Sequence, residues 1–173
     1  MSKTIIHFFF LFIIMILAQV IIFNNICLFN VAIPIVFIYF IIKLPVTLSA
    51  NWVLTLSFIM GFCIDIFSDT HGMHSLACTI IAMMRRNILK LYFPREDDLT
   101  NPEPSIHSLG IGVYTKYVFT IVLLYNSLIF LIESFSIFNL GLLILRIITS
   151  TLLTFLIIIG IDSITIQRRE KRL

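Results

Sequence analysis

The stretch GFCIDIFSDTHGMHSLA, residues 61–77, places two aspartates and two histidines inside a long apolar region. Its two glycines divide it into the end of one helix, a sharp turn and the start of another helix. Gly61 allows a neighbouring helix to approach closely. Gly72 permits a positive φ where the chain reverses. The stretch therefore predicts a helical corner with a carboxylate, that of Asp65, near its turn.

The composition of the whole chain indicates which solvent surrounds this corner. Hydrophobic residues make up 60% of the chain and charged residues only 12%, whereas soluble domains carry about 25% charged residues. A soluble domain of 173 residues cannot bury so large an apolar fraction. Apolar runs of about 17 or more residues are typical of membrane helices. We therefore expect an all-α integral membrane protein with a single membrane domain, residues 1–173, in a lipid bilayer.

The apolar runs predict a six-helix transmembrane bundle, because a helix needs about 20 residues to cross roughly 30 Å of hydrocarbon. The first run has no A-x-A-like cleavage site, so we interpret it as a retained helix rather than a signal peptide. The fourth run contains Arg85 and Arg86. It spans only if these side chains snorkel or face the protein, and a re-entrant hairpin is the alternative. The predicted spans are residues 5–23, 26–42, 48–67, 73–91, 113–132 and 137–161.

The positions of the basic residues predict the orientation of this bundle. All twelve Lys and Arg residues except Arg146 fall on one side of the predicted spans, and Arg146 lies inside the sixth. The positive-inside rule then places both termini in the cytoplasm. The polar loop 92–112 and the basic tail 162–173 are expected on the same side.

Asp65 and Arg146 are candidate partners within the bilayer. An aspartate at the centre of a membrane helix costs about 2.5–3.5 kcal/mol on insertion scales, and less near the interface. Asp65 therefore needs a partner, which is either Arg146 or the polar groups of the corner itself. Glu133 competes with Asp65 for Arg146. Asp162 is expected to be an interfacial residue beside the basic tail.

The sequence shows no pattern that predicts catalysis. It contains no nucleophile elbow, phosphate-binding loop, HExxH motif or paired catalytic carboxylates. Asp69, His71 and His74 suggest a metal site, but an exposed polar turn explains them as well. We therefore expect a protein that is not an enzyme, with no metal, no cofactor and no nucleic-acid partner.

The corner motif resembles the MreD family of rod shape-determining proteins. The resemblance extends over the chain in helix number and topology, and over residues 61–77 in motif. It is carried by Gly61-x-x-x-Asp65-x-x-Ser68-x-x-x-Gly72, followed by Leu76 and Ala77.

This resemblance implies a non-enzymatic scaffold in the bacterial inner membrane that belongs to the cell-elongation machinery and regulates cell shape. The implied partners are MreC, the actin-like MreB, and the glycosyltransferase and transpeptidase that carry out peptidoglycan synthesis in the lateral wall. Gly61, Asp65, Gly72 and Arg146 are then the expected structural or assembly residues.

The fold of this family is similar to the substrate-binding membrane component of vitamin uptake transporters, which supplies a second hypothesis. The chain would then be a small-molecule-binding membrane subunit of an uptake transporter. Such a subunit should enclose a polar-lined pocket near residues 65–74, open to the outer side. A scaffold should instead pack this region without water and satisfy Asp65 with protein groups.

Overall fold

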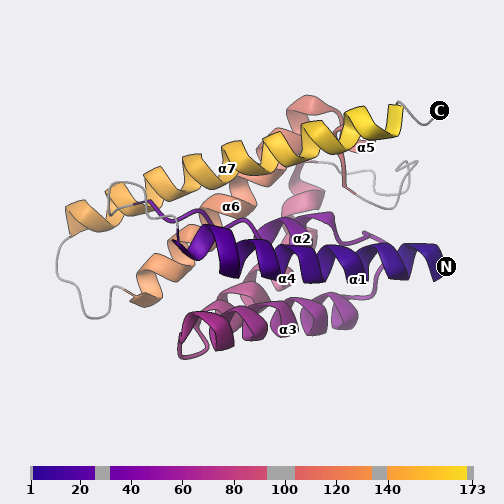
Figure 1. The fold of residues 1–173 in the computed structure, drawn as a ribbon. Helices are drawn as coiled ribbons and strands as arrows, with labels where there is room; N and C mark the ends of the chain where they lie inside the picture. Colours follow the sequence, from indigo (N-terminus) through magenta and orange to yellow (C-terminus); the bar gives the residue numbers. More distant parts are fainter. Residues whose placement is uncertain (1, 26–31, 93–103, 134–139, 171–173) are drawn as a thin grey trace.

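The computed structural model describes residues 2–25, 32–92, 104–133 and 140–170 (Figure 1). The regular structure in these ranges is helical. Its elements are α1 (Ser2–Leu17), a π-helical turn η1 (Ala18–Ile22), a 3-10 turn η2 (Phe23–Asn25), α2 (Ile38–Lys43), α3 (Ala50–Ser68), α4 (Met73–Tyr92), α5 (Ile106–Leu109), α6 (Ile111–Glu133) and α7 (Leu140–Glu170).

The helices form an elongated bundle whose two ends differ (Figure 1). Helix α1 begins and helix α7 ends at one end, which we call the terminal end. Helices α3 and α4 form a hairpin whose turn lies at the opposite end, which we call the corner end. Helix α4 packs between α3 and α6, and α6 packs against α7.

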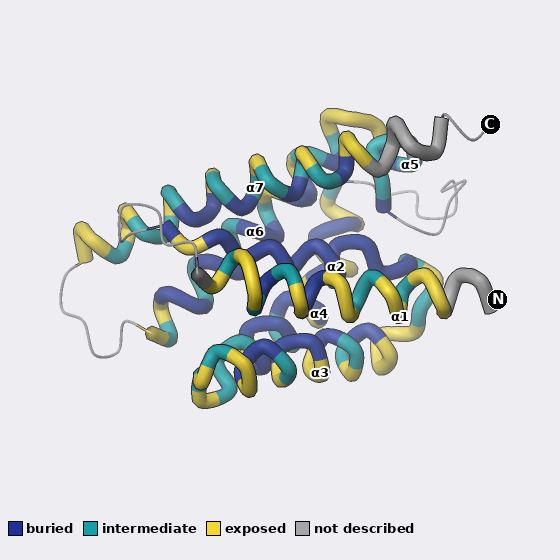
Figure 2. The backbone as a smooth tube through the Cα atoms, in the orientation of Figure 1, coloured by how far each residue is buried: buried dark blue, intermediate teal, exposed yellow. Residues whose placement is uncertain are grey.

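Three helices in the described part of the chain are long and apolar enough to cross a membrane. They are α3, α6 and residues Leu140–Ile164 of α7. Exposed residues follow the outward faces of α1, α3 and α7 (Figure 2), and large apolar side chains such as Phe9, Phe62 and Leu156 are among them. Monomeric soluble proteins rarely expose apolar faces of this extent, which are typical of surfaces that contact a membrane or another protein. In a bilayer these faces would contact the lipid chains, so the structure indicates a membrane protein.

Most of the predicted helices are present, with boundaries that differ by a few residues. Helix α4 runs without a break through Arg85 and Arg86. Helix α7 continues to Glu170 and thus includes most of the predicted tail. Of the predicted loop 92–112, residues 93–103 lie outside the described residues. The rest contains the short helix α5, whose first turn is capped by the Ser105 side chain.

The prediction of a second membrane helix at residues 26–42 is wrong within the described part of that range. Residues 26–31 lie outside it, residues 32–37 are not helical, and α2 comprises only Ile38–Lys43. Pro34 provides a physical reason, because proline lacks an amide hydrogen and disfavours a helical conformation at the preceding Ile33. Residues 35–42 are nonetheless buried, so non-helical chain passes through the interior of the bundle.

Helix α7 satisfies part of the backbone in this non-helical segment. The amide of Ile33 donates to Oγ of Ser150 at 3.1 Å, and the amide of Ile35 donates to Oγ1 of Thr154 at 3.0 Å. Ser150 and Thr154 are buried and four residues apart, so they lie on one face of α7. An unpaired amide in a bilayer costs several kcal/mol, so these two hydroxyls stabilise the extended conformation.

Gln19, in the π-helical turn η1, satisfies the next part of the same segment. Its Oε1 accepts from the amide of Val36 at 2.8 Å, and its Nε2 donates to the carbonyl oxygen of Pro34 at 3.1 Å. Irregular backbone at membrane depth is tolerated where protein groups bind it. Gln19, Ser150 and Thr154 together explain why the chain need not be helical here.

Candidate functional site

The turn between α3 and α4 has left-handed backbone at two positions. Asp69, which follows the last residue of α3, has φ of 52°, and Gly72, which precedes α4, has φ of 81°. A Cβ at Gly72 would meet nothing within 4 Å. The positive φ predicted for Gly72 is therefore confirmed, and its glycine is required by backbone conformation rather than by space.

Asp65 caps the N-terminus of α4 from its position on α3. Its Oδ1 accepts from the amide of His74 at 3.0 Å and from the hydroxyl of Thr70 at 2.6 Å. Its Oδ2 accepts from the amide of Ser75 at 2.8 Å and also from the Ser75 hydroxyl. The two amides lie in the first turn of α4, where backbone amides have no hydrogen-bond acceptor within their own helix. Asp65 is only 4% exposed, and the positive end of the α4 dipole stabilises the charge of its carboxylate.

Gly61 allows the approach of α3 and α4 that this capping requires. A Cβ at Gly61 would lie 2.6 Å from the carbonyl oxygen of His74 and 2.7 Å from Cα of Ser75. The close approach predicted at Gly61 is thus present, and it occurs against backbone that Asp65 also binds. Because Gly61 and Asp65 are four residues apart, they lie on the same face of α3.

Arg146 does not join this corner. Its guanidinium lies 3.8 Å from a carboxylate oxygen of Glu133, and the two side chains are 36% and 42% exposed. The predicted pairing with Asp65 is therefore replaced by the competing pairing with Glu133. The physical reason is that the α4 amides and two hydroxyls already bind the Asp65 carboxylate. An ion pair as long and exposed as Arg146–Glu133 contributes about 0–1 kcal/mol.

His74 points toward the core, away from Asp69 and His71, so the three residues that suggested a metal site do not come together. Its Nδ1 lies 2.7 Å from the Tyr125 hydroxyl on α6, and its ring packs edge-on against Phe37. Asp69 and His71 are exposed on the turn. In the described ranges, no three His, Cys, Asp or Glu side chains gather as ligands for a metal ion. His74 instead links the start of α4 to the core.

A buried ion pair at the terminal end was missed by the sequence analysis. Lys43 Nζ lies 2.5 Å from Oδ1 of Asp162, and both residues are buried. The Tyr39 hydroxyl donates to the same oxygen at 3.0 Å, and Lys43 also donates to the carbonyl oxygen of Pro104 at 3.2 Å. Asp162 is thus a core residue rather than the interfacial residue expected. The pair joins α2, α7 and the segment before α5.

Arg85 is a second buried basic residue. Its side chain faces the protein, which is one of the two arrangements that the sequence left open. Its Nε donates to the Tyr117 hydroxyl at 3.1 Å, and one terminal nitrogen donates to the carbonyl oxygens of Ile42 and Leu44. Those carbonyls belong to the C-terminal end of α2, where helices leave acceptors unpaired and where positive charge is stabilising. Arg85 therefore fixes α4 to the end of the short helix α2.

The buried charged side chains of the described residues thus form two centres. Asp65 caps α4 beside the α3–α4 turn, whereas Lys43, Asp162 and Arg85 meet around the C-terminal end of α2. The corner is the centre that the sequence motif predicts. Comparison of the chain with protein-family models, with curated proteins and with solved structures finds no match in any of the three.

Proposed function

We propose that the chain is a non-enzymatic scaffold of the bacterial cell-elongation machinery, held in the inner membrane with both termini in the cytoplasm. The observation that carries this proposal is the protein-satisfied Asp65 carboxylate. It lies in a corner built on Gly61, Asp65 and Gly72, the residues by which the sequence resembles the MreD family.

The hydrogen bonds of Asp65 favour a scaffold over a small-molecule-binding subunit. A carboxylate offers about four lone-pair sites to donors. Four donors from Thr70, His74 and Ser75 bind this one. A ligand would have to displace at least one of them, so the carboxylate serves the geometry of the protein.

The non-helical segment 32–37 supports the same choice. In transporters, interrupted helices present free backbone groups to the substrate or the coupling ion. Here side chains of the protein occupy the amides of Ile33, Ile35 and Val36. The interruption therefore contributes to packing.

A scaffold of this shape meets its partners chiefly through helix faces. The outward faces of α1, α3 and α7 are apolar, so they suit the membrane helix of a partner such as MreC. The cytoplasmic side, with the basic end of α7, is the proposed approach for MreB and for the cytoplasmic parts of the glycosyltransferase and transpeptidase.

Purification in mild detergent from a rod-shaped host tests the proposal. An affinity-tagged chain should bring MreC with it. Asp65→Leu should lose MreC and rod shape, because it removes both carboxylate oxygens that accept from Thr70, His74 and Ser75. Asp65→Asn keeps an acceptor oxygen and should retain part of both. Asp69→Asn is the matched control, since Asp69 is exposed and asparagine tolerates its left-handed backbone.

Two results would contradict the proposal. One is a chain that purifies with a bound small molecule and without any elongation protein, which would favour the transporter subunit. The other is an Asp65→Leu variant that keeps both MreC and normal cell shape.

A further inference from the structure

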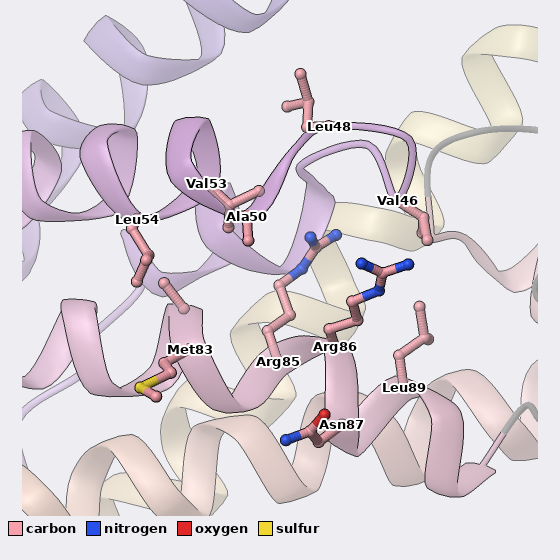
Figure 3. Close-up of a pocket in the computed structure, with 11 residues that line it drawn as sticks. Val46, Leu48, Ala50, Val53, Leu54, Met83, Arg85, Arg86, Asn87 and Leu89 are labelled. Carbon is pink, nitrogen blue, oxygen red and sulfur yellow. The ribbon is translucent and has the colours of Figure 1, made fainter.

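The two ends of the α3–α4 hairpin differ in whether their basic side chains can change charge. Where α3 begins and α4 ends, Arg85 and Arg86 line a pocket of about 160 Å³ (Figure 3), and an arginine stays charged throughout the physiological range. At the other end, the first turn of α4 carries His74. Histidine is the side chain whose charge changes between about pH 5 and 8, so the corner contains a group that can respond to pH.

His74 lies among rings that accommodate a positive charge poorly. Its ring is edge-on to Phe37, with 5.8 Å between the centroids, and nearly parallel to the ring of Tyr125, with 6.4 Å between them. Among the described residues, the titratable groups around it are Asp65 on α3, Cys78 on α4 and Tyr125 on α6.

Asp65 is the one member of this group that is charged near neutral pH. Its carboxylate attracts an imidazolium, but four donors already bind it, and the His74 ring is not one of them. The carboxylate therefore offsets only part of the cost of burying a charge beside Phe37 and Tyr125.

The hydrogen bond of His74 indicates the position of the ring proton. Nδ1 lies 2.7 Å from the Tyr125 hydroxyl, which also faces the Cys78 thiol. A thiol sulfur is a weak acceptor, whereas the bare nitrogen of a neutral imidazole is a good one. The hydroxyl therefore donates to Nδ1, and the ring proton is on Nε2. A proton added at Nδ1 turns this acceptor into a donor, so the hydroxyl must then donate to the weaker acceptor, Cys78.

We propose that His74 is an acid-sensitive switch in the α3–α4 corner. With a neutral ring, the start of α4 is held to α3 through Asp65 and to α6 through Tyr125. Protonation weakens the attachment to α6 and places a charge in the core, so it favours an open corner in which the ring faces solvent. His74 is only half-buried and lies close to exposed His71, so protons reach it from outside the bundle. This switch is a property of the fold, and it would operate in a scaffold and in a transporter subunit alike.

Unfolding of the purified full chain in detergent, compared at about pH 8 and pH 5, tests the switch. The unfolded chain binds a proton at His74 near pH 6.5, whereas the closed corner holds the neutral ring. The unfolded state then binds more protons than the folded state, so stability should fall as the pH falls through this range. One proton changes the unfolding equilibrium by at most about tenfold per pH unit.

Three variants assign this loss to His74. His74→Asn keeps an acceptor for the Tyr125 hydroxyl but cannot be protonated, so it should remove most of the pH dependence. His71→Asn changes an exposed histidine of the same turn and should leave the pH dependence as it is. Tyr125→Phe removes the hydroxyl, so it should lower the unfolding midpoint at pH 8 and have little effect at pH 5, where the hydrogen bond is already weakened.

Three results would overturn the proposal. A chain that becomes more stable on acidification would show that His74 forms an ion pair with Asp65. Equal pH dependence in His74→Asn and in the unmodified chain would show that another group is responsible. If His74→Asn does not fold, an equal loss from Tyr125→Phe at both pH values would show that the hydrogen bond does not respond to protonation.

Discussion

The backbone amide of Ser75 donates a hydrogen bond of 2.8 Å to the carboxylate of Asp65. This bond joins the first turn of α4 to the last part of α3, two helices that follow each other in the chain. A helix is ordinarily capped by the residue just before it, but here the cap comes from the preceding helix. The angle between α3 and α4 therefore depends on one carboxylate and on the two glycines that let the backbones meet and turn.

Replacement of Gly61 by alanine should force α3 and α4 apart. The new Cβ would lie 2.6 Å from a backbone oxygen, and overpacking of this kind costs about 1–3 kcal/mol. Gly160→Ala is the matched control, because a Cβ there meets nothing within 4 Å. In an exposed stretch of helix it should stabilise by roughly 0.5–1 kcal/mol. Thermal unfolding in detergent measures both, and equal midpoints for the two variants would refute the close contact.

Replacement of Gly72 tests the backbone of the turn alone. Gly72→Val should destabilise the protein by about 1–3 kcal/mol, because a β-branched residue is strained at φ of 81°. Gly72→Asn should cost less, since asparagine adopts left-handed backbone more readily and no atom crowds this position. Detergent-solubilised yield and unfolding midpoint are the measurements. If Val and Asn behave alike, φ at this position does not govern the stability of the corner.

Thr154→Val should destabilise the non-helical segment by about 1–3 kcal/mol, because it leaves the buried amide of Ile35 without its acceptor while keeping the shape of the side chain. Thr149→Val is the control on the same helix, since Thr149 is only half-buried and its hydroxyl donates to carbonyls of its own helix. Its effect should stay within about 0.5 kcal/mol. Hydrogen exchange at Ile35 reports the same bond locally, and unchanged protection in Thr154→Val would contradict it.

Lys43 and Asp162 should behave as a coupled pair. Lys43→Met leaves the Asp162 charge buried and unpaired, which costs about 3–5 kcal/mol. Asp162→Leu should be similarly unfavourable. The double variant removes both charges and should recover most of the lost stability. Unfolding midpoints of the four proteins give the coupling free energy, and purely additive losses would mean that the two charges act independently.

The sequence predicted the corner and the long helices because their signals are local. Gly61, Asp65 and Gly72 have the spacing of a helix end followed by a turn. Helices α3, α6 and α7 come from apolar runs too long for another structure in a membrane. The sequence offers two partners for Asp65, namely Arg146 and the polar groups of the corner. The structure distinguishes them, because Asp65 binds the amides at the start of α4 and Arg146 pairs with Glu133.

The sequence did not predict the non-helical segment, because an apolar run has the same composition whether it is helical or extended. Its conformation depends on acceptors far along the chain, Ser150 and Thr154, which are 117 and 119 residues from the amides they bind. Pro34 was the one local signal. The burial of Asp162 likewise depends on Lys43, which is distant from it in the chain. Its position at the end of an apolar run therefore led to the wrong prediction of an interfacial side chain.

The most direct test of the α3–α4 corner is a double-mutant cycle on Asp65 and Arg146. Unfolding midpoints are measured for the unmodified protein, Asp65→Leu, Arg146→Leu and the double variant. Because Asp65 binds the start of α4 and Arg146 binds Glu133, the two losses should add, with a coupling below about 0.5 kcal/mol. Asp65→Leu should account for nearly all of the loss. Recovery of stability in the double variant would contradict this account, since it would show that the two charges are partners.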